Sequence, residues 1–267
     1  MSNFSTGSPD TITGEHYAVH PGGAHLLSVS TTAGELLFLS PNTEYFPAKP
    51  VRGGIPIIGP RFGTMNAAGQ PEEPNHGMLR SSAWEIRGDA AGFDAELKHR
   101  GINYHLQVTA PGTGLQAQLV ATNNSPTSQR IQLGFHPYFA VTDVRKISIH
   151  GAGGRPAFDS IAGKEMVEPE EIRITDLTDQ IINRARQMRI VDVDRVISVS
   201  STTSDHTVMW NPGPANAAAM DDLGERYWPN FVCVEPALLG DSREGVEVAP
   251  GRSIMLDMVV SVSPAHS

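Results

Sequence analysis

Apolar and polar residues alternate with a period of two along most of this chain. Residues Gly114–Asn123 read GLQAQLVATN, where Leu115, Ala117, Leu119 and Ala121 alternate with polar neighbours. Successive side chains of a β-strand point to opposite faces, so this period predicts a half-buried strand. The same reading predicts further strands at His25–Ser30, Glu35–Leu39, Ala95–His99, Tyr104–Thr109, Ile131–Phe135, Lys146–His150, Arg195–Val199, His206–Trp210, Phe231–Glu235 and Ser253–Val262.

Helical periodicity is scarce, and we expect short helices only at Asn216–Gly224 and Asp176–Asn183. Glycine (26 residues) and proline (20 residues) are spread along the chain, which suits many short strands joined by turns. One hairpin is expected through the Arg100–Gly101 corner. No repeat, low-complexity tract or linker divides the sequence. We therefore predict one all-β domain over residues 1–267, an antiparallel sandwich or barrel.

Composition narrows the classes of partner. The formal net charge of -9 argues against nucleic-acid binding, which needs clustered lysine and arginine. The single cysteine, Cys233, forms neither an intramolecular disulfide nor a cysteine-based zinc site. The N-terminal residues lack the pattern of a secretion signal, and no stretch approaches the ~18 apolar residues of a membrane span. We expect a cytoplasmic protein that does not act at a membrane.

Two glycine-rich segments carry arginines. Val51–Gly63 reads VRGGIPIIGPRFG, a loop that lets a ligand approach the backbone between Arg52 and Arg61. Asn75–Arg80 reads NHGMLR and places a histidine four residues before an arginine. Either segment can equally be a surface turn with solvated side chains, because glycine-rich loops are weak signals.

Two strand ends carry groups suited to proton transfer. Gly134–Phe139 reads GFHPYF, where a proline breaks regular structure just after His136. Phe231–Pro236 reads FVCVEP, an apolar run that ends in Glu235. Burial at a strand end raises the pKa of a carboxyl group towards the range useful for acid–base catalysis. The alternatives are a histidine satisfied inside an aromatic cluster and a glutamate paired with an arginine.

Other signals are weaker. The acidic pair in DVDRV, Asp192 and Asp194, can orient a ligand or close a turn, and Asp221–Asp222 reads as a helix cap. Only His16 and His20 among the ten histidines show H-x-x-x-H spacing, and no further metal-ligand motif accompanies them, so we predict no catalytic metal. Nucleophile-elbow, P-loop and dinucleotide-binding patterns are missing, so we predict no cofactor.

Taken in order, the segments resemble the aldose 1-epimerase superfamily, and most closely its hexose-6-phosphate 1-epimerase branch. The matching pieces are RGGIP at Arg52–Pro56, HGMLR at His76–Arg80, Trp84, GFHPYF at Gly134–Phe139, VDRV at Val193–Val196, VMWNP at Val208–Pro212, FVCVEPA at Phe231–Ala237 and APG at Ala249–Gly251. Each motif is weak alone, but their shared order is specific. The resemblance implies a galactose mutarotase-like antiparallel β supersandwich that is monomeric and binds one sugar or sugar phosphate.

The resemblance also implies roles for residues. The catalytic histidine falls on His136 and the catalytic glutamate on Glu235. A second active-site histidine falls on His76 and a sugar-binding aspartate on Asp194. Arginines at the positions of Arg52 and Arg80 contact the phosphate in the sugar-phosphate branch. Two departures lie beside this expected anion pocket: Arg61 stands where the branch usually has an aromatic residue, and HGMLR replaces HGFAR.

The implied reaction is mutarotation. The C1 hydroxyl loses its proton to Glu235, the ring oxygen takes a proton from protonated His136, and the C1–O5 bond breaks. Rotation about C1–C2 and reclosure give the other anomer without a cofactor. The alternatives are a free-aldose 1-epimerase, a non-catalytic carbohydrate-binding module on the same fold, or a glycoside hydrolase or lyase, for which Asp194 would supply the second carboxylate.

Overall fold

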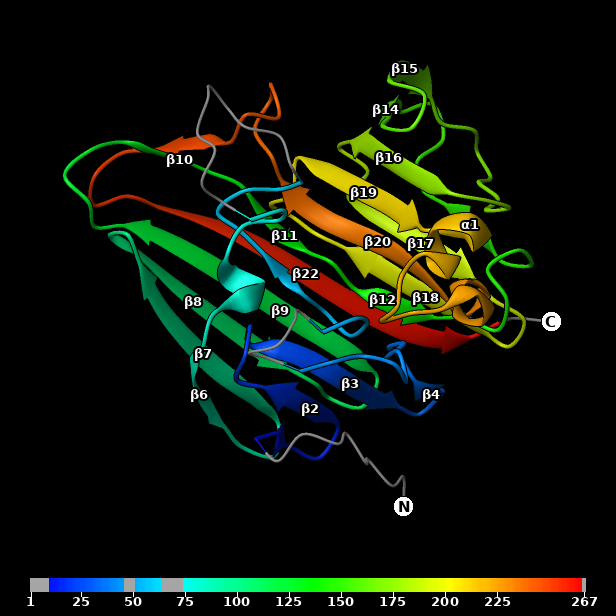
Figure 1. Ribbon diagram of the computed structural model, residues 1–267, viewed down its shortest axis with the longest axis horizontal. Helices are drawn as coiled ribbons and strands as arrows, with labels where there is room; N and C mark the ends of the chain where they lie inside the picture. The colour runs from blue at the N-terminus through cyan, green and yellow to red at the C-terminus, as the bar shows by residue number, and fades with distance from the viewer. Residues whose placement is uncertain (1–9, 46–50, 64–73, 266–267) are drawn as a thin grey trace.

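Two antiparallel sheets form the body of the protein. The computed structural model describes residues 10–45, 51–63 and 74–265. The first sheet has the order β15 (Lys164–Val167), β14 (Pro156–Asp159), β16 (Thr178–Asn183), β19 (His206–Asn211), β20 (Phe231–Leu238), β11 (Leu133–Phe135) and β5 (Ile57–Ile58), with β12 (Tyr138–Ala140) also paired to β20. It lies on the viewer's side in Figure 1.

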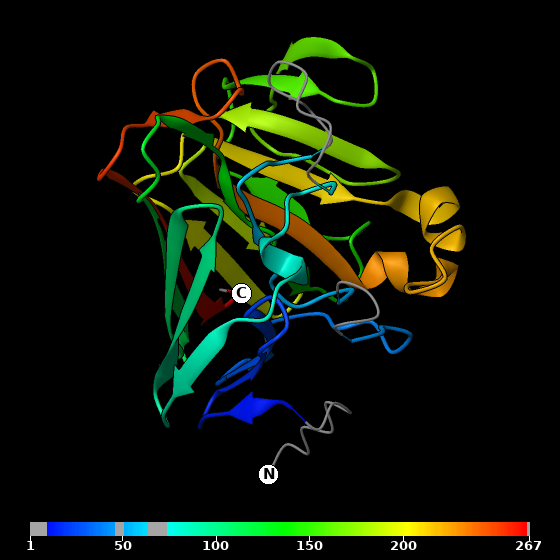
Figure 2. The ribbon, with the colours of Figure 1, turned by 60° about the vertical axis from the view of Figure 1, so that its left-hand side comes forward.

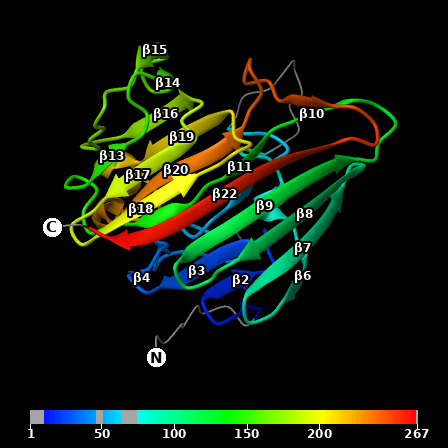
Figure 3. The same ribbon diagram turned by 180° about the vertical axis from the view of Figure 1, so that it is seen from behind.

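The second sheet is seen from behind in Figure 3. Its order is β13 (Ser148–His150), β17 (Gln187–Val191), β18 (Arg195–Ser200), β22 (Ser253–Pro264), β9 (Gly114–Asn123), β8 (Ile102–Thr109), β7 (Gly92–His99) and β6 (Glu85–Gly88). A smaller sheet joins β1 (Ile12–Thr13), β2 (Tyr17–His20), β3 (His25–Thr31) and β4 (Gly34–Glu35), and a ribbon joins β10 (Gln129–Ile131) to β21 (Val246–Val248).

One apolar core lies between the sheets. Leu119 and Leu256 of the second sheet and Val232 and Val234 of β20 are fully buried members of the same cluster. Each large buried aliphatic side chain contributes roughly 1.5–3 kcal/mol to folding. Since Val232 and Val234 point into this core, Cys233 and Glu235 must point to the opposite face of β20.

The helical segments are few and short. The helix α1 (Gly213–Ala218) and the 3₁₀ turn η2 (Glu225–Asn230) form the connection from β19 to β20 along the chain. Both lie at one end of these strands (Figure 2). A second 3₁₀ turn, η1 (Leu79–Ser81), precedes β6. No helix of the described residues is long and apolar enough to cross a membrane.

Most predicted strands are confirmed. The hairpin of β7 and β8 turns at Arg100 and Gly101, which both have positive φ (47° and 78°), as a two-residue hairpin turn requires. Residues 131–135 instead divide between β10 and β11, and 35–39 form only the end of β4 and isolated bridges at Leu37 and Leu39.

The helix predictions are less accurate. Asn216–Gly224 overlaps only the end of α1. The prediction for Asp176–Asn183 is wrong, because Thr178–Asn183 forms β16, which pairs with β19 over its whole length and with β14 over residues 180–182. The spacing of Leu177 and Ile181 fits a helical turn, but adjacent β-branched isoleucines favour a strand once two neighbours supply hydrogen bonds.

Candidate functional site

Glu235 lies in the middle of the first sheet, on the face turned away from the core. It is opposite Val208 of β19, and its side chain is 1% exposed. One carboxylate oxygen, Oε2, is buried without a hydrogen-bond partner. A carboxyl group at such a position loses its hydration without receiving protein donors in return.

His136 stands in the gap between β11 and β12, where Pro137 interrupts the strand. The backbone continues on both sides, since His136 N–H donates to the Pro56 carbonyl and Tyr138 N–H donates to the Gly54 carbonyl. This break directs the imidazole towards β20. Its Nδ1 lies 3.3 Å from Glu235 Oε1 and has no hydrogen-bond partner. The two residues thus form a close, buried pair whose polar atoms are not fully satisfied.

Burial drives both members of the pair towards their neutral forms. It raises the pKa of Glu235 well above its ordinary value, and the nearby Asp179 carboxylate adds to this effect. It lowers the pKa of His136 well below its ordinary value, with further lowering by His76, Arg80 and Arg52. The proton of the pair therefore rests on the Glu235 carboxyl group, beside a neutral imidazole.

Aromatic rings hold the imidazole in place. The Tyr138 ring stacks on His136 with centroids 4.9 Å apart and planes 9° apart. Trp210 meets both rings edge-on, at 5.7 Å from His136 and 6.0 Å from Tyr138. Phe231 packs below Tyr138 and Trp210. Trp210 is partly exposed, so an apolar ring surface lies next to the His136–Glu235 pair.

The glycine-rich loop brings Arg52 to the same place. Its Nε and one terminal nitrogen contact Asp222 Oδ2 at 3.1 Å each, and its other terminal nitrogen donates to the Tyr138 hydroxyl at 3.0 Å. Tyr138 and Asp222 together raise the pKa of Arg52. Asp222 was expected only to cap a helix, but its side chain instead fixes this guanidinium.

The next loop supplies His76 and Arg80. His76 has a left-handed backbone (φ 66°), and Gly77 follows in the same region (φ 69°), where an added Cβ would lie 2.2 Å from the Gly59 carbonyl oxygen. This turn places the His76 ring 5.7 Å from that of His136. Burial and the charges of Arg80 and Arg52 lower the pKa of His76 to about 3.

Arg80 has a buried donor without a partner. One terminal nitrogen donates to the Asn75 carbonyl at 2.8 Å, whereas its buried Nε has no partner. Burial, and then the neighbouring Arg52, lower its pKa. A guanidinium held in this way has capacity to bind an anion.

Asp179 is a further candidate residue of this site, although the sequence analysis did not select it. Asp179, Trp210 and Cys233 are directly opposite one another on β16, β19 and β20, so their side chains share a face of the sheet. Burial raises the pKa of Asp179. The spacing of two residues between Asp179 and Ile181 is a signal for a strand that would place both side chains on one face. The sequence analysis instead predicts a helix for this segment.

Asp194 and Arg61 lie elsewhere. Asp194 is exposed just before β18 in the second sheet, and its backbone carbonyl accepts from Ala265 N–H. The structure therefore does not bring its side chain to the others. Its neighbour Asp192 closes a turn through its backbone N–H, which donates to the Arg195 carbonyl, and its carboxylate accepts from the backbone N–H of the distant Thr142. Arg61 donates to the Arg130 carbonyl at 3.0 Å, so its charge is directed to the β10 ribbon.

One set of possible metal ligands occurs among the described residues. His136, Cys233 and Glu235 each offer one ligand atom, and these atoms lie within 4.8 Å of one another. Spacing along the sequence could not reveal this set, because Cys233 and Glu235 lie on β20 whereas His136 lies about 100 residues earlier, between β11 and β12.

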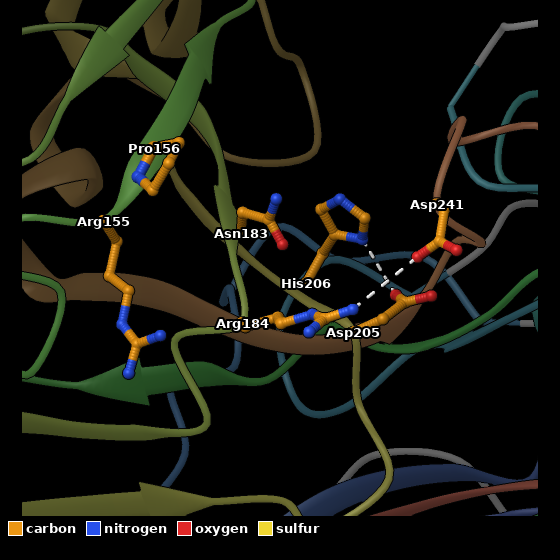
Figure 4. Close-up of a pocket in the computed structure, with 7 residues that line it drawn as sticks. All are labelled: Arg155, Pro156, Asn183, Arg184, Asp205, His206 and Asp241. Atoms are coloured by element: carbon orange, nitrogen blue, oxygen red, sulfur yellow. Dashed lines mark hydrogen bonds and ion pairs between the residues drawn. The ribbon is translucent and has the colours of Figure 1, made fainter.

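A second histidine–carboxylate pair lines a separate pocket of about 230 Å³. Figure 4 shows its lining residues, Arg155, Pro156, Asn183, Arg184, Asp205, His206 and Asp241. His206 Nδ1 lies 2.8 Å from Asp205 Oδ1, and the same carboxylate accepts from the backbone N–H groups of Leu239 and Gly240. This pocket does not include the His136–Glu235 pair.

Comparison with known proteins gives a consistent result. The family model for aldose 1-epimerase matches residues 11–261. A relative in Escherichia coli (strain K12), named "Putative glucose-6-phosphate 1-epimerase", is 28% identical over 85% of this chain and 81% of its own. A relative of the same name in Salmonella typhimurium is also 28% identical, over 86% and 82%.

The solved structures agree with this match. A protein described as a "putative mutarotase" from Salmonella typhimurium superposes with a TM-score of 0.83 at 25% identity, covering 96% of this chain and 90% of its own. A galactose mutarotase-like protein from Lactobacillus casei ATCC 334 shares the fold, with a TM-score of 0.72 at 15% identity over 95% and 99%. The predicted galactose mutarotase-like β fold is thereby confirmed.

Proposed function

Because this chain belongs to the aldose 1-epimerase family, we propose that it interconverts the α and β anomers of a hexose 6-phosphate, with His136 and Glu235 transferring the protons. The observation that carries this proposal is the buried His136–Glu235 pair, 3.3 Å apart, beside the free Nε donor of Arg80. The choice of a phosphorylated hexose is supported by the names of the two relatives, which are both called putative glucose-6-phosphate 1-epimerases.

Mutarotation needs one acid and one base. The His136–Glu235 pair supplies both, because the two side chains share one proton. Ring opening removes the proton of the C1 hydroxyl, protonates the ring oxygen and breaks the C1–O5 bond. Reclosure after rotation about C1–C2 reverses these transfers. Each positioned proton transfer typically contributes ~10²–10⁴-fold to the rate.

The location of the shared proton depends on the ligand. Without an anion, burial together with His76, Arg80 and Arg52 keeps His136 neutral, so the proton rests on Glu235. A phosphate dianion near the two arginines offsets their positive field, which raises the pKa of His136 and favours its protonated form. The phosphorylated substrate thus prepares His136 to act as the acid.

The remaining side chains bind the sugar. We assign the phosphate first to Arg80, because Asp222 and Tyr138 already occupy all three nitrogens of Arg52. His76 is oriented by Gly63 N–H at its Nδ1, which leaves Nε2 for a sugar oxygen. Asp179 shares the face with Cys233 and Trp210, so we propose that it, rather than Asp194, binds a hydroxyl.

The test is anomer exchange measured by NMR on free and 6-phosphorylated hexoses side by side. We expect acceleration of both, with a higher kcat/KM for the phosphorylated sugar. Equal values for the two substrates would reduce the proposal to a free-aldose 1-epimerase. Tight sugar binding without exchange would instead support the non-catalytic module.

A further inference from the structure

Cys233 lies on the floor of the catalytic site without a role in the proton transfers. It precedes Glu235 by two residues on β20, so the thiol and the carboxyl group emerge on the same face. Cys233 is paired with Tyr138 of the neighbouring strand β12, and His136 precedes Tyr138 by two residues. This arrangement brings imidazole nitrogen, thiol sulfur and carboxylate oxygen within 4.8 Å of one another.

Two of these three ligand groups have unsatisfied polar atoms. His136 Nδ1 and Glu235 Oε2 are buried and have no hydrogen-bond partner. Buried polar atoms without partners are uncommon in native proteins, and a bound ion is one of the arrangements that satisfies them. A cation between the strands would bond to His136 Nδ1 and to one oxygen of the Glu235 carboxylate.

The chemistry of the donors selects the kind of cation. Imidazole and thiolate with one carboxylate are the ligands of borderline-soft ions such as Zn²⁺, whereas Mg²⁺ and Ca²⁺ prefer oxygen ligands. Ligand atoms around a tetrahedral Zn²⁺ lie ~3.3–3.8 Å apart, given bonds of ~2.0–2.3 Å. The His136–Glu235 separation of 3.3 Å already fits, so the sulfur needs a shift of only ~1 Å or less.

We propose that His136, Cys233 and Glu235 form a binding site for Zn²⁺ or a similar divalent cation, and that the metal-bound protein is an inhibited mutarotase. The inhibition rests on the proposed function, because the metal takes the same nitrogen and carboxylate that transfer protons. Substrate and metal therefore exclude each other. The nearby positive charges of Arg52 and Arg80 oppose the cation and limit its affinity.

Cys233 makes the proposal testable, because removing the thiol damages the metal site and leaves the proton-transfer pair in place. Purified wild-type protein and Cys233→Ala would be titrated with Co²⁺ while thiolate-to-cobalt charge-transfer absorption is recorded, and with Zn²⁺ by calorimetry. We expect one Co²⁺ per wild-type chain with this absorption, and its loss in Cys233→Ala. Cys233→Ser serves as a second variant in case alanine disturbs the packing around the thiol.

The same proteins would then be assayed for anomer exchange with increasing Zn²⁺. We expect inhibition competitive with the sugar phosphate in wild type, and at least ~10-fold weaker inhibition in Cys233→Ala with its basal rate retained. A wild-type protein without the charge-transfer band at saturating Co²⁺ overturns the site. Equal inhibition of wild type and Cys233→Ala overturns it as well. Metal binding through Cys233 in a protein without exchange activity would refute only the proposed function.

Discussion

Two histidine–carboxylate pairs lie on one sheet and are built in opposite ways. Glu235 is opposite Val208 on β19, and His206 lies two residues from Val208 on the same face. In the pocket of Figure 4, Asp205 accepts from His206 at 2.8 Å and from two backbone N–H groups. In the proposed catalytic pair, Glu235 lies 3.3 Å from His136, and its second oxygen has no donor.

The difference in hydrogen-bond donors shifts the pKa values of Asp205 and Glu235 in opposite directions. Although burial opposes it, the hydrogen bonds from His206 and the backbone lower the pKa of Asp205, which stays ionised. Glu235 has burial without compensation, so its pKa rises. A carboxylate satisfied by backbone donors is locked in one state and stabilises the fold. One that lacks donors is a poorer structural element and a better proton carrier.

The largest expected effect concerns the catalytic pair acting as a unit. His136→Gln and Glu235→Gln should each slow anomer exchange of a hexose 6-phosphate by ~10²–10⁴-fold. The double variant should lie within ~3-fold of the slower single variant, because either loss removes the shared proton path. NMR exchange rates at saturating substrate would measure this. Additive losses would mean that the two side chains act separately.

The next largest effect is expected on KM when Arg80 of the proposed phosphate site is replaced. Arg80→Met should raise KM for the sugar phosphate by ~10–150-fold, since a hydrogen bond to a charged group contributes ~1.5–3 kcal/mol. KM for the free hexose should change by less than ~3-fold. The matched control is Arg184→Met, which removes a guanidinium from the second pocket and should leave both KM values unchanged. Equal increases for both sugars in Arg80→Met would argue against phosphate binding there.

A smaller effect is expected on stability from the second pair. Asp205→Asn should lower the free energy of unfolding by ~1–2 kcal/mol, because it weakens the charged hydrogen bonds from His206, Leu239 and Gly240. Its exchange rate should stay within ~3-fold of wild type. Urea denaturation and the same NMR assay would measure the two quantities. A large loss of rate in a folded Asp205→Asn would remove the distinction between the pairs.

The pH dependence of stability should have opposite signs in the two places. Glu235 has a raised pKa, so its stabilising contribution is complete below ~4.3 and is lost as pH rises through the raised value. Asp205 has a lowered pKa, so its contribution is present above ~3.9 and is lost as pH falls through the lowered value. Relative to wild type, Glu235→Gln should therefore become more stable between pH 4 and 8. The deficit of Asp205→Asn should stay constant over that range and shrink below it. Unfolding free energies that change in parallel for both variants would contradict this reading.

The sequence predicts the sheet strands well because their period of two is a local property. It also selects His136 and Glu235 as candidates, since proline after a strand and a carboxylate after an apolar run are visible in the letters, but their expected roles come from the family resemblance. Asp179 was missed because Leu177 and Ile181 have helical spacing, and only pairing with β14 and β19 makes the segment a strand. The partnership of Arg52 with Asp222 spans 170 residues, so no local pattern could predict it.

The most direct measurement compares anomer exchange in wild type, Glu235→Gln and Asp205→Asn at equal concentrations of folded protein. The account predicts that Glu235→Gln is slowed by ~10²–10⁴-fold while still binding the sugar phosphate, and that Asp205→Asn stays near wild type. A near-wild-type rate in Glu235→Gln would contradict the assignment of His136 and Glu235 as the groups that open and close the sugar ring.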